Sequence, residues 1–174
     1  RRVTTDMSGI RDIYDRIAAL LRSRPSIAPP VSLSNKTLAW AGFSRIYLDA
    51  AKTLRGQTTP LSLPWIQLIG QSLECAIKAC LCVSNIEPDK THNLITLFEK
   101  AERAGFTLPE YCLVRIVTLS ITYYEQPGTG VKFMARFPTD ALDGIGPLVD
   151  SPSFLEEAID SLLDQAEAKL RTVV

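Results

Sequence analysis

The sequence predicts an all-α protein, an up-and-down bundle of about five to six helices in a single domain, residues 1–174. Two observations predict it. Apolar residues recur at spacings of three and four along most of the chain, and prolines and glycines separate these stretches. The 174 residues are enough to bury a core without disulfides. Nineteen basic residues balance nineteen acidic ones, so the overall charge favours neither nucleic acid nor an acidic membrane as a partner.

The first predicted helix covers residues 10–21 and is followed by a proline-rich linker at 25–34, because each proline there removes a backbone donor. Residues 1–6 precede Met7, which we expect to be the natural start, with those six residues outside the fold. The second predicted helix covers residues 35–54. Its apolar stripe is expected to face the core and consists of Trp40, Phe43, Tyr47, Ala50 and Leu54.

The third predicted helix begins at Leu63 and Pro64, since proline in a first turn costs little, and it is apolar enough to be central. Pro88 is expected to follow its end, and Asp89 or Thr91 to cap the next helix. The apolar residues of that fourth helix recur at i, i+3, i+4 and i+7, and Gly105 closes it. They are Leu94, Leu97, Phe98 and Ala101.

Two further helices complete the predicted bundle. Residues 113–124 also fit the alternation of a strand, but the length of the segment and Pro109 at its start favour a helix. Residues 126–152 hold eight prolines and glycines and are predicted to form one long loop. The last helix is expected to begin at Ser151 or at Ser153, the latter in a capping box with Glu156.

The cysteines predict buried thiols in a reducing compartment, and therefore a cytoplasmic protein, because they lie in or beside apolar segments. They are Cys75, Cys80, Cys82 and Cys112. Polar residues and a proline interrupt the apolar stretches before about 20 residues, so no membrane span is predicted. One histidine and thiols at unsuitable spacings make a poor zinc site, and we expect neither a metal nor another cofactor.

Glu74 and Lys78 are the first candidate site residues, since a spacing of four brings their side chains together on a helix. Two interpretations stay open: a structural ion pair, or a buried pair that binds a ligand. His92 is the only histidine, so it is the candidate for any chemistry that needs an imidazole base near neutral pH. The alternative is that it fixes the entry to the fourth helix.

Two other patterns could bind a ligand. Lys132 and Arg136 alternate with phenylalanines in an extended pattern that would place cations and rings against a phosphate or a base, or would form an edge strand over the bundle. Aromatic residues could also line a small-molecule pocket between helices. These are Trp40, Tyr47, Tyr123 and Tyr124.

Three segments resemble the HEPN domains, over the range Leu63 to Pro138. They are Ser72-Leu73-Glu74-Cys75-Ala76-Ile77-Lys78-Ala79-Cys80-Leu81, Thr91-His92-Asn93-Leu94 and Ala135-Arg136-Phe137-Pro138. The resemblance implies a helical bundle that usually dimerises, in a family of prokaryotic toxin, defence and nucleotide- or RNA-associated proteins. Many members cleave RNA with an arginine that precedes a histidine, with four to six residues between them.

Here the corresponding positions before His92 are Asn85, Ile86 and Glu87, so that arginine is missing. The leading hypothesis is therefore a non-catalytic homodimer that binds RNA, a nucleotide or a cognate protein in a prokaryotic toxin–antitoxin or defence setting. Its binding residues are expected to be Glu74, Lys78, His92, Asn93, Lys132 and Arg136. The alternative is a metal-independent ribonuclease in which Arg115 or Arg136 supplies the missing cation to His92.

Overall fold

The computed structural model describes residues 32–55, 63–123 and 152–173, together with Ala19. The chain separates into residues 1–31 and residues 32–174, and the helical bundle belongs to the second of these units. Its helices are α2 (Leu33–Arg55), α3 (Leu63–Val83), α4 (Leu94–Arg103), α5 (Glu110–Tyr123) and α6 (Pro152–Val173). The described part of the chain contains no strand, which confirms the all-α prediction. The helix predicted at 10–21 and most of the predicted linker and long loop lie outside the described residues.

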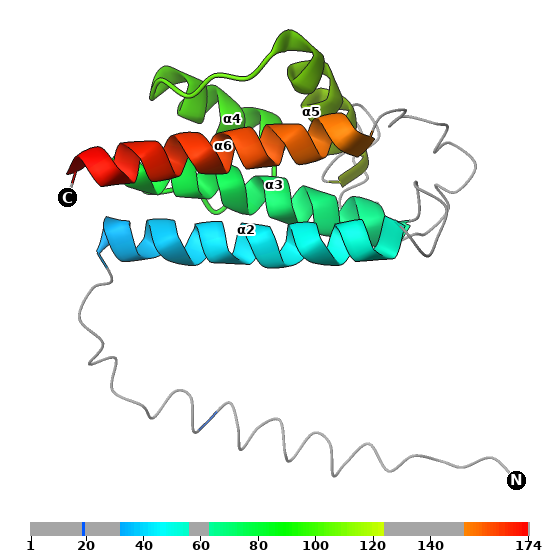
Figure 1. Ribbon diagram of the computed structural model, residues 1–174, viewed down its shortest axis with the longest axis horizontal. Helices are drawn as coiled ribbons and strands as arrows, with labels where there is room; N and C mark the ends of the chain where they lie inside the picture. Colours follow the sequence, from blue (N-terminus) through cyan, green and yellow to red (C-terminus); the bar gives the residue numbers. More distant parts are fainter. Residues whose placement is uncertain (1–18, 20–31, 56–62, 124–151, 174) are drawn as a thin grey trace, which may run out of the picture. The chain divides into compact units, whose positions relative to one another are not determined.

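The centre of the bundle is α3, which contacts each of the other four helices. α2 lies along it in the opposite direction, α6 lies along it in the same direction, and α4 and α5 lie on the side away from α2 (Figure 1). Every residue from Ser72 to Val83 is buried. The length and mean hydropathy of Pro64–Val83 would suit a membrane span, but 83% of this stretch is buried inside the bundle. It is therefore the core helix that the sequence predicted.

α2 packs against α3 through small side chains rather than through its aromatic stripe. Its buried residues are Thr37, Ala41, Ser44, Leu48 and Ala51. Ser44 Oγ donates to the Ser72 carbonyl and Ser72 Oγ donates to the Ser44 carbonyl, both at 2.8 Å, which requires the two backbones to lie close together. The prediction that the aromatic stripe faces the core is wrong for Phe43, which is 50% exposed, whereas Trp40 and Leu54 of the same stripe are partly buried against the core. A face of alanine and serine allows a closer approach than bulky rings would.

α3 and α4 end in the same hydrogen-bonded motif, in which a residue with positive φ reverses the chain. Asn85, with φ 58°, follows α3, and the Ile86 N–H donates to the Leu81 carbonyl at 2.9 Å. Gly105, with φ 94°, follows α4, as predicted. Because Asn85 already turns the chain, α3 ends before Pro88 is reached.

The starts of the last two helices test the remaining boundary predictions. α5 begins directly after Pro109 and is helical, so the choice of helix over strand is confirmed. α6 begins at Pro152, which places Ser153 inside the helix. The capping box predicted for Ser153 and Glu156 is wrong: Glu156 Oε1 instead lies 2.8 Å from Arg55 Nη1 of α2.

Lys169 of α6 holds the ends of two other helices. Its ammonium donates to Ser84 Oγ at 2.9 Å and to the Ala104 carbonyl at 3.1 Å, and it lies 5.1 Å from the centre of the Phe106 ring. The carboxyl ends of helices carry partial negative charge, so a cation is stabilising there. This contact ties α6 to the loops that follow α3 and α4.

Candidate functional site

Glu74 is the centre of a buried polar cluster. Its carboxylate accepts hydrogen bonds from Lys78 Nζ to Oε1 at 2.7 Å and from the Tyr123 hydroxyl to Oε2 at 2.8 Å. His92 Nδ1 lies 2.9 Å from Oε2 and 3.1 Å from Oε1. Three elements, α3, α5 and the loop before α4, therefore meet at one carboxylate. We call Glu74, Lys78, His92 and Tyr123 the Glu74 cluster.

The Glu74 carboxylate is ionised in the folded protein. Glu74 is 4% exposed, and burial by itself would raise the pKa of its carboxyl group. The hydrogen bonds from Lys78, His92 and Tyr123, together with the charge of Lys78, outweigh burial and lower that pKa. Because an ionised carboxylate only accepts hydrogen bonds, Nδ1 of His92 must carry the proton that the two share.

His92 sits in a loop that is fixed at several points. Lys36 of α2 pairs with Glu87 at 2.7 Å, and Lys100 of α4 pairs with Asp89. Asn93 is the N-cap of α4, where its side-chain oxygen accepts the N–H groups of the second and third helical residues at 3.0 and 3.1 Å. The loop therefore presents the histidine in one position.

The predicted choice of Asp89 or Thr91 as the cap of α4 is wrong. Thr91 Oγ1 accepts the Asn93 N–H at 3.1 Å, one step before the helix, so the threonine orients the cap rather than being it. His92 immediately precedes this cap, which leaves its side chain directed at α3 with 36% of its surface exposed. The side-chain oxygen of Asn93, predicted to bind a ligand, is used by the helix.

Tyr123 reaches Glu74 because Gly70 leaves room for its ring. A Cβ added at Gly70 would lie 2.3 to 2.7 Å from three carbons of the Tyr123 ring. The ring thus packs on the backbone of α3, and its hydroxyl arrives one turn further along, at Glu74. Sequence reasoning treated Tyr123 only as a pocket wall. The available signal was a glycine within a long apolar helix, four residues before Glu74.

Lys78 is 7% exposed, and its ammonium lies 5.0 Å from the centre of the Trp40 ring as well as beside Glu74. This cation–π contact uses one of the aromatic residues predicted to line a pocket. Tyr123 is fully buried against Gly70, and Trp40 lies over Lys78. Both rings therefore make contacts within the bundle, and Tyr124 lies outside the described residues, so the small-molecule pocket stays a prediction.

The two arginines considered as substitute cations differ in what the structure shows. The Arg115 guanidinium lies 5.9 Å from the centre of the Phe154 ring at the start of α6. Arg136 and Lys132 lie outside the described residues. Of the predicted binding residues, the structure therefore brings together Glu74, Lys78 and His92.

Comparison with known families agrees with this arrangement. Residues 48–125 match the HEPN domain family model. This part of the chain is similar to HEPN domains. The match includes every residue of the Glu74 cluster, and it confirms the resemblance that the sequence carried. No curated protein and no solved structure matches the chain.

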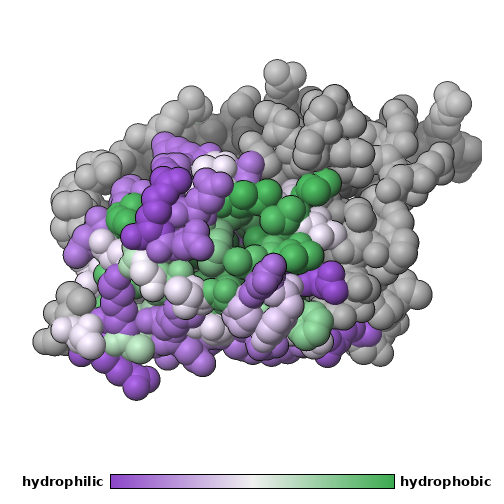
Figure 2. Space-filling view, turned by 90° about the horizontal axis from the view of Figure 1, so that it is seen from above, coloured by the Kyte–Doolittle hydropathy of each residue, from purple (hydrophilic) through white to green (hydrophobic). Residues whose placement is uncertain are grey.

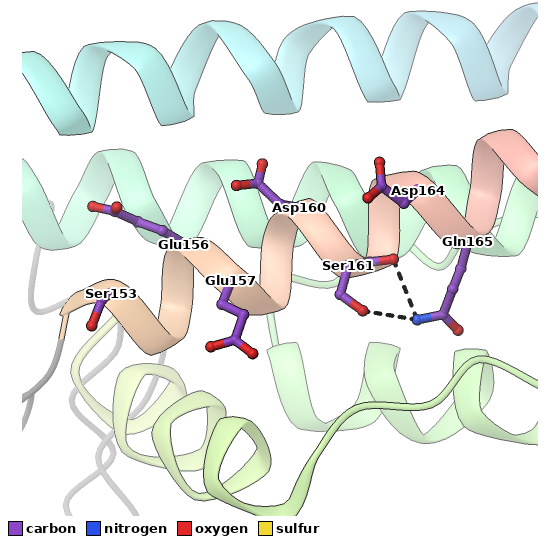
Figure 3. Close-up of a pocket in the computed structure, with 7 residues that line it drawn as sticks. All are labelled: Ser153, Glu156, Glu157, Asp160, Ser161, Asp164 and Gln165. Carbon is purple, nitrogen blue, oxygen red and sulfur yellow. Dashed lines mark hydrogen bonds between the residues drawn. The ribbon is translucent and has the colours of Figure 1, made fainter.

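A pocket of the helical bundle lies on α6, away from the Glu74 cluster. Its lining residues are Ser153, Glu156, Glu157, Asp160, Ser161, Asp164 and Gln165. Glu156, Asp160 and Asp164 project from α6 toward the side of α2, whereas Glu157 projects toward α5 (Figure 3). Lys52 of α2 pairs with Asp160 at 3.7 Å. The surface is acidic, so it would repel a phosphate backbone.

The four cysteines are free and buried, as predicted. Burial raises the pKa of the Cys75 thiol to about 12 and that of the Cys82 thiol to about 11. A thiol attacks a disulfide only as the thiolate, so these groups are expected to be unreactive in the native state.

In a thiol assay with a chromogenic disulfide at neutral pH, we expect fewer than one fast-reacting thiol per native chain and four after denaturation. Two or more fast-reacting thiols in the native protein would contradict the burial described for these cysteines.

Proposed function

We propose that this HEPN-like domain self-associates and binds a partner without cleaving RNA, in a prokaryotic toxin–antitoxin or defence setting. The observation that carries the proposal is the charge balance of the Glu74 cluster. The ring of His92 is held by a carboxylate, and the cation of the cluster, Lys78, is bound to that same carboxylate. Cleavage of a phosphodiester needs positive charge where the transition state becomes more negative. In this cluster the charge of Lys78 is already neutralised by Glu74.

A cognate protein suits the described surface better than RNA or a nucleotide does. Two helices expose large apolar side chains, which mark binding surfaces when they gather. These side chains are Leu38, Phe43 and Ile46 on α2, and Tyr111, Val114 and Val117 on α5. Figure 2 shows hydrophobic side chains gathered on the face over α5, with hydrophilic side chains beside them. The acidic surface of α6 adds to the argument against a phosphate-bearing ligand.

The absence of cleavage can be tested by incubating the purified chain with mixed RNA in the presence of a chelator. We expect no cleavage above buffer by the natural protein, and the same result for His92→Ala. Binding of RNA is measured on the same samples by filter retention and is expected to be weak and salt-sensitive. Cleavage by the natural protein that disappears in His92→Ala would contradict the proposal.

That outcome would support a second candidate function, a metal-independent ribonuclease. One contact favours it: a carboxylate at Nδ1 orients an imidazole so that Nε2 can accept a proton, as a general base must. Replacing Arg115 and Arg136 by Lys or Gln, one at a time, would then identify the cation that assists His92. Loss of cleavage in the variants of only one of the two arginines would identify that arginine as the cation.

A further inference from the structure

We infer that two copies of this chain associate through the exposed face of α2, antiparallel, about a two-fold axis that passes between Ser44 and Arg45. The inference rests on the self-association proposed above and names its surface. The residues of this α2 face are Leu38, Ala39, Gly42, Phe43, Ile46 and Ala50. Helix α2 forms the outer layer of the described bundle, on the side of α3 away from α4 and α5 (Figure 1).

The α2 face is apolar and unusually exposed. Leu38 is 58%, Phe43 50% and Ile46 63% exposed, within nine consecutive residues of one helix. The cations of the same helix point elsewhere: Arg45 pairs with Glu167 of α6, and Lys36 pairs with Glu87. The sequence therefore concentrates large apolar side chains on the side of α2 that the other described helices leave open.

Gly42 lies in the middle of this face, and no contact among the described residues requires a glycine there. A Cβ added there would meet no atom within 4 Å. Glycine weakens a helix interior relative to alanine, and its usual justification is a close approach of another backbone. For Gly42 that backbone must come from outside the described residues. A second helix lying across the α2 face would supply it.

The order of residues on the α2 face is symmetric, which selects a second copy as the occupant. Phe43 and Ile46 lie equally far on either side of the point between Ser44 and Arg45, and Ala39 and Ala50 lie equally far beyond them. An antiparallel pair about that point places Phe43 of each copy on Ile46 of the other, and Ala39 on Ala50. A two-fold interface requires this reciprocity, in which residue i meets j and j meets i. Large side chains then pair at the centre and small ones at both ends.

Charge agrees with this register. Arg45 and Asp49 lie on the same edge of the α2 face, and a two-fold axis brings like edges together. The Asp49 carboxylate of one copy is then within reach of the Arg45 guanidinium of the other. Arg45 is 49% exposed and so keeps donors available beyond its contact with Glu167.

Light scattering of the full chain tests the surface. We expect the natural protein to be a dimer and Ile46→Asp to weaken association by at least about tenfold, because it places two carboxylates at the centre of the interface. Val117→Asp is the matched control, since Val117 is 44% exposed on the other apolar helix. It is expected to leave the dimer intact, and circular dichroism verifies that both variants are folded.

Each other outcome has a distinct meaning. A natural dimer that Ile46→Asp leaves intact would overturn the inference while keeping the proposed self-association, and dissociation by Val117→Asp would move the interface to α5. A natural protein that stays monomeric at every concentration would overturn both. In that last case, the partner of the α2 face would be a different protein and not a second copy.

Cysteine pairing tests the register. The natural cysteines are buried, so Ala39→Cys and Ala50→Cys each add one accessible thiol. Under mild oxidation we expect a disulfide-linked dimer when the two single variants are mixed, and little from either alone. In the proposed register the two copies of residue 39 lie about 16 Å apart along the helix, too far for a disulfide. Rapid cross-linking of Ala39→Cys with itself would overturn the antiparallel register.

Discussion

Replacing Glu74 by alanine is expected to destabilise the fold by about 3–5 kcal/mol, because it leaves Lys78 buried without its carboxylate. Tyr123 and His92 lose the same acceptor, so the loss extends to groups from α5 and from the loop before α4. The free energy of unfolding in urea, measured for both proteins, gives the difference directly. A loss below about 1 kcal/mol would show that Lys78 finds water or another partner at little cost.

A double variant separates the removal of one charge from the removal of the pair. Glu74→Leu combined with Lys78→Met replaces the buried ion pair by apolar side chains, a change that is often neutral. We therefore expect it to recover most of the stability lost in Glu74→Ala. Equal losses in the single and double variants would indicate that the contacts of Glu74 with His92 and Tyr123 carry the stability instead.

Low pH is also expected to remove the stabilisation that the ionised Glu74 carboxylate gives to the fold. The folded-state pKa of Glu74 is lowered from its ordinary value of 4.5, so the carboxylate stabilises the fold above that value and loses this effect as the pH falls through the folded-state pKa. The stability difference between the natural protein and Glu74→Gln is thus expected to be largest at neutral pH and to shrink below pH 4.5. A difference that grows in acid would contradict the assigned sign.

Replacing Gly70 by alanine is expected to destabilise the fold by about 1–2 kcal/mol. The new Cβ would lie 2.3 to 2.7 Å from the Tyr123 ring carbons, and overpacking of this kind costs about 1–3 kcal/mol or more, against about 1 kcal/mol gained in helix propensity. Thermal and urea unfolding measure the change. The displaced ring should also withdraw its hydroxyl from Glu74.

Gly42→Ala is the matched control, because the same substitution in α2 meets no atom within 4 Å. In the monomeric Ile46→Asp background it is expected to stabilise the chain by about 0.5–1 kcal/mol. Tyr123→Ala added to Gly70→Ala removes the clash, so the double variant should lose less than the sum of the single losses. Equal effects of alanine at positions 42 and 70 would contradict the close contact described for Gly70.

The helices were predictable where the pattern has one interpretation. The apolar run of α3 and the i, i+3, i+4, i+7 spacing of α4 identify core residues, because each leaves one choice of buried residues. The buried face of α2 was predicted wrongly because its aromatic and its small residues form two stripes, and periodicity alone does not say which stripe is buried. The serine exchange between Ser44 and Ser72 depends on two helices meeting closely, which no single segment reveals.

Three residues of the candidate site were predicted from the sequence, but the contacts that His92 and Tyr123 make with Glu74 were not. The spacing of four predicted the contact between Glu74 and Lys78, and His92 was a candidate because it is the only imidazole in the chain. That His92 meets Glu74 across the bundle follows from the turn at Asn85 and from the cap at Asn93. Tyr123 could not be assigned as a donor from sequence, since its place depends on the space at Gly70.

The proton on the imidazole ring of His92 tests the central claim most directly. His92 is the only histidine in the chain, so ¹⁵N nuclear magnetic resonance of the imidazole group reports on this site alone. At a pH where the ring is neutral, we predict that Nδ1 is protonated and Nε2 is not, because ionised Glu74 accepts from Nδ1. A ring protonated at Nε2, with Nδ1 bare, would show that Glu74 does not hold the histidine and would contradict the account.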